Sequence, residues 1–231
     1  MRLRPIAAAV AVPLALVSLS ACGESALQKY AKTAPATIDK DARAAITALK
    51  SVHISGSTDD NGTALGLDLS LDTKGNCIGS ITAGAQKINI IGLSSGKVFI
   101  KTSADFWQRV GGVSAAQAAQ MAPKWVTGTS VAEFGTMCNL TNFSKSLSET
   151  TVAKDKPKFN GTAKVAGADV VNILISNTDG TTSILSVDAG SPHNILKVAD
   201  GKGGKAMTFS KFNVPVNPVA PTGAVDIGSV G

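Results

Sequence analysis

Three cysteines are the side chains of this sequence best suited to covalent chemistry, and their positions separate the first from the other two. Cys22 closely follows an apolar run, Ile6 to Leu19, which itself comes after Arg2 and Arg4. A short positive segment, an apolar stretch and small residues before a cleavage point form the layout of a secretory signal. The run is shorter than the ~20 apolar residues that span a bilayer. The sequence therefore predicts that residues 1–21 are a signal peptide.

The stretch Leu19-Ser20-Ala21-Cys22-Gly23 resembles the lipobox of bacterial lipoproteins. The resemblance implies cleavage before Cys22 and acylation of its thiol and new amino group, with palmitate among the chains. Because one acyl chain anchors a protein only marginally, the two or three chains implied here would hold it firmly on the cell membrane. Everything after Cys22 would then be extracytoplasmic. Two alternatives stay open, namely cleavage after Ala21 with Cys22 an ordinary residue, and an uncleaved membrane anchor.

Cys77 and Cys138 remain as an even pair in an oxidising compartment if Cys22 is acylated. We expect a disulfide between them. It would close a loop of roughly 60 residues and contribute about 4 kcal/mol in the chain-entropy model. The alternative is two buried free thiols. Neither cysteine has a CxxC partner or a nearby histidine, so no metal site is expected.

The other reactive side chains do not suggest an active site. His53 and His193 are the only two histidines and lie far apart in the sequence, so we expect structural or surface roles for both. The glycines form no phosphate-binding loop, and no obvious pair of acids lies in the apolar strands. The sequence therefore predicts no enzymatic activity and no cofactor.

Charge and size describe the exported part as one mildly basic domain. The chain has 231 residues and a formal charge of +6, and the signal segment contributes Arg2 and Arg4 without any acid, which leaves +4. The positive charges are scattered and aromatic residues make up only 4%. No basic stripe with interleaved aromatics indicates nucleic-acid binding, so we expect the charge to serve solubility. About 200 residues can bury a substantial core, which favours a single domain.

The spacing of apolar residues divides the chain into a helix, five strands, a helical insertion and five more strands. A flexible tether is expected over 22–38. Helices are expected over 39–50, 104–110, 114–121 and 130–147. Strands are expected over 52–57, 65–72, 77–82, 87–91, 97–101, 158–165, 168–176, 181–188, 192–199 and 205–212. Residues 214–231 are expected to form an extended edge segment that frays.

Ten meandering strands with one apolar face require something to cover that face. A sheet this wide curls strongly because each strand pair twists, and the helices at 39–50 and 104–147 are available as cover. We therefore expect an α+β fold over residues 39–213, in which a strongly curved antiparallel sheet of about ten strands forms a half-barrel. Such a sheet capped by helices encloses a concave apolar space.

This layout resembles the half-barrel lipoproteins of actinobacteria of the LppX, LprA, LprF and LprG type, and more distantly the LolA and LolB carriers. Two stretches carry the resemblance, the helix-to-strand passage of residues 44–54 with its Leu49-Lys50-Ser51-Val52-His53, and Ser95 to Ile100 followed by Phe106-Trp107. The Cys77 and Cys138 pair is not transferred from the mycobacterial members and indicates a divergent branch.

The resemblance implies a protein that binds acylated lipids or glycolipids in its cavity and carries or presents them in the cell envelope. We expect a monomer, with the membrane and a membrane transporter as further partners. The alternative is a packed-core envelope lipoprotein that serves as an interaction or structural module without a ligand cavity. The aliphatic residues expected to line a cavity are Leu65, Leu67, Leu69, Leu71, Ile88, Ile90, Val171, Ile173 and Ile175. On the fourth strand of the first group, Asn89 and Ile91 are the alternative to Ile88 and Ile90.

Two tryptophans and a group of basic residues surround the helical insertion. Trp107 and Trp125 either anchor the short helices on the sheet, which we prefer, or meet ligand or membrane at the cavity mouth. The basic residues either form a solvated face, which we prefer, or meet anionic headgroups. They are Lys97, Lys101, Arg109 and Lys124.

Overall fold

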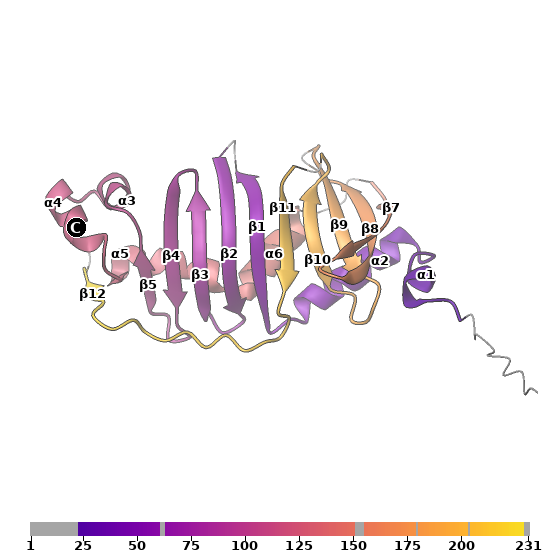
Figure 1. Ribbon diagram of the computed structural model, residues 1–231, viewed down its shortest axis with the longest axis horizontal. Helices are drawn as coiled ribbons and strands as arrows, with labels where there is room; N and C mark the ends of the chain where they lie inside the picture. The colour runs from indigo at the N-terminus through magenta and orange to yellow at the C-terminus, as the bar shows by residue number, and fades with distance from the viewer. Residues whose placement is uncertain (1–22, 61–62, 151–154, 179, 203, 229–231) are drawn as a thin grey trace, which may run out of the picture.

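The computed structural model describes residues 23–60, 63–150, 155–178, 180–202 and 204–228. The predicted signal peptide and Cys22 lie outside these residues. The described chain forms one open, curved sheet of twelve strands, in the order β12-β6-β5-β4-β3-β2-β1-β11-β10-β9-β8-β7 (Figure 1). Helices α2, α5 and α6 lie along one face of this sheet (Figure 1).

Two antiparallel meanders make up most of the sheet and join at β1. The first consists of β1 (Ser51–Asp60), β2 (Thr63–Asp72), β3 (Cys77–Ala83), β4 (Gln86–Gly92) and β5 (Val98–Lys101). The second consists of β7 (Lys158–Val165), β8 (Ala168–Ser176), β9 (Thr182–Asp188), β10 (Ile195–Asp200) and β11 (Ala206–Ser210). Strand β11 pairs antiparallel with β1, with His53 opposite Ser210. This pairing makes the two meanders one continuous sheet.

The expected α+β half-barrel is confirmed, with two more strands than the ten predicted. The additional strands are β6 (Val126–Thr127) and β12 (Val225–Asp226). They pair in parallel with each other, and β6 also pairs with β5. Each has two residues, too few to show the alternation by which strands are recognised.

Six α-helices and one 3-10 helix occur among the described residues. They are α1 (Ala26–Tyr30), α2 (Pro35–Thr47), α3 (Ala104–Arg109), α4 (Ala115–Met121), α5 (Thr129–Ala132), η1 (Glu133–Cys138) and α6 (Leu140–Thr150). Ser114 caps α4, and its hydroxyl accepts a hydrogen bond from the N–H of Gln117. Helix α2 buries Ile38, Ala42 and Ile46 against the sheet.

The expectation of a flexible tether over 22–38 is wrong for much of that segment. Helix α1 begins after Ser25, whose side chain and that of Gln28 form a reciprocal capping box. Tyr30 at its end is 7% exposed. Helix α2 begins at Pro35 rather than at residue 39, because proline at the first helical position lacks only an N–H that would be unbonded there anyway. The folded domain therefore starts close to Cys22.

The C-terminal segment is extended, as expected, but its described part does not fray. It runs along one end of the strands from β11 to β12 (Figure 1). The N–H of Asn213 donates to the carbonyl of Ser51 at 2.9 Å, and the N–H of Val225 donates to the carbonyl of Trp125 at 2.8 Å. Val216 between these points is 9% exposed. Hydrogen bonds at both ends and a buried side chain between them hold the segment on the sheet.

Candidate functional site

A groove of about 510 Å³ lies on the helix-covered face of β1, β2 and β3 and reaches Met207 of β11, beneath η1 and α6. Strict alternation along β2 directs its four leucines to this face, while Asp68 and Ser70 point to the opposite one. The residues that line the groove are Ile54, Thr58, Leu65, Leu67, Leu69, Leu71, Ile81, Thr136, Met137, Asn142, Phe143 and Met207. None of them carries a charge, so the groove suits an apolar ligand.

The leucines of β2 become more buried from one end of the strand to the other. Leu65 and Leu67 are half-buried, whereas Leu69 is 4% and Leu71 is 1% exposed. Leu65 pairs with Thr58 near the β1–β2 turn, and Leu71 pairs with Cys77 at the other end. The groove is therefore open toward the β1–β2 turn and closed toward Cys77.

A disulfide between Cys77 and Cys138 is present, as the sequence led us to expect, and links η1, which lies over the groove, to the strand β3. It joins the start of β3 to the end of η1, with the two Cα atoms 5.1 Å apart. A Cβ atom on Gly92 would lie 2.7 Å from Sγ of Cys138, so only glycine fits beneath the disulfide. The side chain of Asn139 then accepts hydrogen bonds from the N–H groups of Thr141 and Asn142, which begins α6 directly after the disulfide.

Polar side chains at the groove are few and neutral. Thr58 lies on β1, Thr136 on η1 and Asn142 on α6, and the last two are exposed. Met137 lies beside Thr136 and is 49% exposed, an unusual fraction for a methionine in a lining. Hydroxyl and amide groups around an apolar groove can hydrogen-bond a polar headgroup without requiring that it be charged.

The structure places the nine residues expected to line a cavity in three different surroundings. Leu65, Leu67, Leu69 and Leu71 all line the groove. Ile88 and Ile90 lie on the helix-covered face of β4 but are buried at 6% and 0% exposure in the packed core. Asn89 and Ile91 accordingly face the other side of β4.

Val171, Ile173 and Ile175 do not line the groove. All three are 0% exposed and belong to the core that α2 covers with Ile38 and Ile46. They form the filled wall of the half-barrel, and the leucines of β2 form its open part.

Eight lining residues were not among those predicted, although half of them had a signal. Ile54 and Ile81 share the alternating pattern of the leucines on neighbouring strands. Met137 and Phe143 belong to the helically spaced apolar residues of 130–147. Thr58, Thr136 and Asn142 gave no signal, since a polar residue beside an apolar groove looks like any surface residue in sequence.

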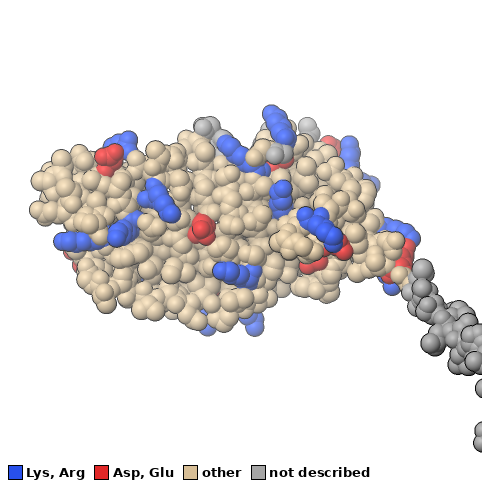
Figure 2. Space-filling model, in the orientation of Figure 1, with Lys and Arg blue, Asp and Glu red and all other residues tan. Residues whose placement is uncertain are grey.

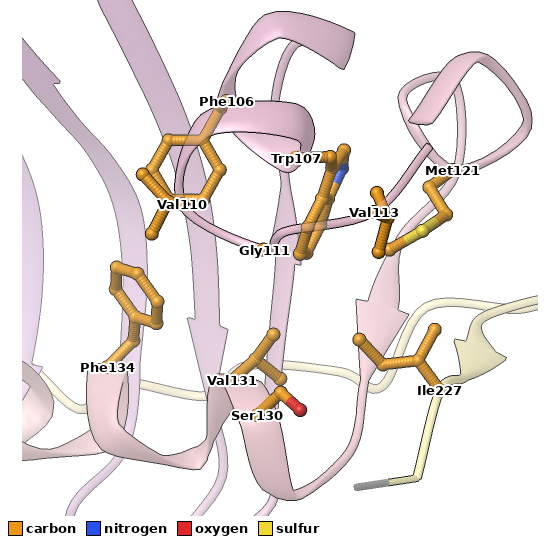
Figure 3. Close-up of a pocket in the computed structure, with 10 residues that line it drawn as sticks. All are labelled: Phe106, Trp107, Val110, Gly111, Val113, Met121, Ser130, Val131, Phe134 and Ile227. Carbon is orange, nitrogen blue, oxygen red and sulfur yellow. The ribbon is translucent and has the colours of Figure 1, made fainter. Parts of the chain in front are cut away.

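A second, smaller cavity of about 180 Å³ lies in the helical insertion, and neither tryptophan lines the groove. In Figure 3, Phe106 and Trp107 of α3, with Val110 directly after that helix, lie opposite Val131 and Phe134. Trp107 is 3% exposed and packs edge-on against Phe106, with ring centroids 5.8 Å apart. Trp125 lies half-buried by a shallow pocket beside Ile90 and Ile91.

The two histidines have separate partners, and Nδ1 of His193 lies 3.0 Å from the carbonyl oxygen of Asp188. His53 Nδ1 lies 3.0 Å from Ser70 Oγ, and its Nε2 lies 3.5 Å from Asp68 Oδ1. These residue types match a catalytic triad, but Ser70 sits within a central strand and its backbone is paired on both sides. Its N–H is therefore not available to stabilise an oxyanion. No group of three or more potential metal ligands occurs among the described residues.

The letters Gly92-Leu93-Ser94-Ser95-Gly96 match the G-x-S-x-G pattern of a nucleophile elbow. That elbow requires a strand-to-helix turn, whereas here the segment links β4 to β5 as a hairpin. The N–H of Gly96 donates to the carbonyl of Leu93 and closes the turn. The match therefore concerns the letters alone.

Charged side chains are dispersed over the surface. Figure 2 shows lysines and arginines interspersed with acids across the visible face, without one continuous basic patch. Lys97, Arg109 and Lys124 are exposed, and the ammonium of Lys97 lies 5.4 Å from the ring centroid of Phe99. None of the helices in the described part is both long and apolar enough to span a bilayer.

Comparisons with known proteins identify the fold. No family model and no curated protein sequence matches the chain. The crystal structure of LprF from Mycobacterium bovis is similar, with a TM-score of 0.55 and 14% identity, covering 82% of this chain and 99% of that one. The lipoprotein LppX from Mycobacterium tuberculosis has a TM-score of 0.48 and 16% identity, covering 79% and 96% of the two chains. The resemblance predicted from the sequence is thus confirmed at the level of the fold, which this chain shares with LprF.

Proposed function

We propose that this protein is a membrane-anchored lipoprotein that binds the acyl chains of lipids or glycolipids in the β1–β3 groove and carries or presents them in the cell envelope. The observation that supports this proposal is the groove itself. Its volume of about 510 Å³ falls within the ~300–1,000 Å³ of small-molecule sites. Its walls are aliphatic, and its lining holds no charge.

The energy of binding would come from removing acyl methylenes from water. Each buried CH₂ contributes about 0.8 kcal/mol, so a long chain binds tightly without a specific set of polar contacts. Thr58, Thr136 and Asn142 are available to hydrogen-bond the headgroup. The sequence resemblance to actinobacterial half-barrel lipoproteins implies the same kind of ligand.

Anchoring through acylated Cys22 would hold the groove near its source of lipid. The folded part begins at α1, whose first residue is Ala26. Four residues of extended chain reach only about 14 Å. The domain would therefore stay close to the bilayer and act there as a monomer, with a membrane transporter as a further partner.

Native mass spectrometry of the whole chain carrying Cys22→Ala tests the lipid-binding proposal. We expect reproducible lipid-mass adducts that disappear on denaturation, on a protein of monomeric mass. Leu67→Trp, which fills the groove, should remove most of the adducts. Ile78→Trp is the matched control, because Ile78 is 47% exposed on the opposite face of the neighbouring strand.

The competing function is a packed envelope module without a ligand. Two results together would support it: a native protein without lipid adducts, and a Leu67→Trp variant whose free energy of unfolding is lower by about 1–3 kcal/mol because the added side chain overpacks the core. Lipid adducts that persist equally in Leu67→Trp and in Ile78→Trp would place the lipid somewhere other than the groove.

A further inference from the structure

We infer that the groove accepts a single acyl chain, which enters with its methyl end first. This inference rests on the proposed lipid-binding function and narrows its ligand. The class it names is lipids with one long chain, such as lysolipids and fatty acids, rather than lipids that must bury two or three chains.

Packed core on both sides limits the groove to four neighbouring strands, β3, β2, β1 and β11. On the side of the second meander, Val171, Ile173 and Ile175 are fully buried beneath α2. On the other side, Ile90 and Ile100 are fully buried in the core, next to the helical insertion. The half-barrel is therefore wide, but only its central part is open.

The volume of the open part corresponds to one chain. An engineered apolar cavity of about 150 Å³ binds one benzene, so about 25 Å³ of cavity corresponds to one carbon atom. By the same measure, the groove's volume of about 510 Å³ holds roughly 20 carbon atoms. A second chain of similar length would need as much space again. The cavity beside Trp107, at about 180 Å³, is too small to take it.

The length of the leucine stripe agrees with this count. Leu65 and Leu71 are six positions apart on β2, which corresponds to about 20 Å along a strand. With carbon–carbon bonds of about 1.5 Å in a zigzag, a 16-carbon chain is about 19 Å long. One extended chain therefore fits the stripe from end to end.

The gradient of burial along the leucines of β2 determines the direction in which the acyl chain lies in the groove. Leu71 is 1% exposed and lies beside the Cys77–Cys138 disulfide, so this end is closed. Leu65 and Thr58 at the opposite end are half-buried. The methyl end of an acyl chain makes no hydrogen bonds to water and can be buried beside Leu71 at no cost in hydration. A polar headgroup buried there would lose its hydrogen bonds to water. The headgroup therefore stays at the end that Leu65 and Thr58 form.

A two-chain lipid would gain little from this groove. Its second chain would remain in water after leaving a bilayer, and exposed methylenes oppose extraction. Single-chain lipids leave nothing apolar exposed. The number of chains, more than the headgroup, should decide which lipid is bound.

In the first experiment, the full-length Cys22→Ala protein is mixed with each of three lipids and analysed by native mass spectrometry. The lipids are palmitate, palmitoyl-lysophosphatidylcholine and dipalmitoyl-phosphatidylcholine. The last two share headgroup and chain length and differ in chain number. We expect one-to-one adducts with both single-chain probes and at least tenfold lower occupancy by the two-chain lipid. The first two probes distinguish a free acid from a lysolipid as the source of the chain.

Equal or higher occupancy by dipalmitoyl-phosphatidylcholine overturns the single-chain inference and leaves the proposed lipid binding intact. Absence of adducts with all three probes overturns both. The two failures are therefore distinguishable.

The second experiment tests the direction of the chain. Leu69→Phe adds volume near the closed end, and we expect it to move the preferred chain length in a series of lysophosphatidylcholines to two to four carbons shorter. Leu65→Phe at the open end should leave the preferred length unchanged. A shift in Leu65→Phe without one in Leu69→Phe overturns the assigned direction, and thermal unfolding verifies that both variants are folded.

Discussion

Tyr30 lies flat on the imidazole of His193, with ring centroids 4.0 Å apart and ring planes 6° from parallel. Tyr30 ends α1, and His193 lies in the turn between β9 and β10. This stack fastens the first helix to the second meander. The chain that leads from Cys22 therefore joins the domain at that end of the sheet, away from α3 and α4 (Figure 1).

Alkaline stability should depend on Tyr30. Burial, followed by the nearby charge of Asp41, raises the pKa of Tyr30 above its ordinary value of 10.0. The unfolded chain loses the phenolic proton near that pH while the folded chain keeps it, so the contribution is complete below pH 10 and falls as the pH rises further. One pH unit above 10, the free energy of unfolding should have fallen by about 1 kcal/mol more in the native protein than in Tyr30→Phe.

Urea unfolding at about pH 9 and pH 11 measures this difference, and the Tyr30→Phe variant controls for the lysines that titrate in the same range. Tyr30 is the only tyrosine, so tyrosinate absorbance reports its ionisation directly. Ionisation of the folded protein at an ordinary tyrosine pKa would contradict the prediction.

The disulfide should account for a large share of the stability. It links positions 61 residues apart, and a loop of that length corresponds to about 4 kcal/mol in the chain-entropy model. Addition of a reductant should lower the free energy of unfolding by about that amount. The Cys77→Ser and Cys138→Ser double variant should be equally destabilised and should not respond to reductant. A native protein of unchanged stability under reduction would show that the bond is absent in solution.

Local pattern was sufficient to predict the long strands. The bounds of β7 and β8 agree with the expected 158–165 and 168–176, because alternation and glycine turns are properties of short segments. Strands β6 and β12 pair Val126 with Val225 across 99 positions, and no local pattern reports such a pairing. Helix α1 did carry a signal, since Ser25 and Gln28 have the spacing of a capping box.

Which apolar strand face would be open could not be predicted from the strands themselves. The residues Val171, Ile173 and Ile175 alternate just as Leu67, Leu69 and Leu71 do. The first set is covered by α2 and the second borders a groove. The difference depends on where a distant helix lies, which is a property of the whole fold.

That difference should appear in the cost of truncation. Ile173→Ala removes a 0% exposed side chain from packed core and should cost about 2–5 kcal/mol. Leu65→Ala truncates a half-buried side chain beside open space and should cost about 1 kcal/mol or less. Chemical denaturation of the ligand-free variants measures both values. Equal costs would mean that the groove at Leu65 is filled in solution.

Release from the membrane should follow the loss of Cys22 alone. Two or more acyl chains are needed for stable anchoring, and in the lipobox all of them depend on Cys22. We therefore expect Cys22→Ala to move the protein from the membrane fraction to the soluble fraction of the extracytoplasmic compartment. The Cys77→Ser and Cys138→Ser double variant keeps Cys22 and should stay with the membrane. Retention of Cys22→Ala in the membrane fraction would show that something other than acylation holds the protein there.

The short distance between Cys22 and α1 should also matter for lipid loading. Because α1 begins four residues after Cys22, a 20-residue glycine and serine insertion between them should leave membrane retention unchanged and slow lipid loading from the bilayer.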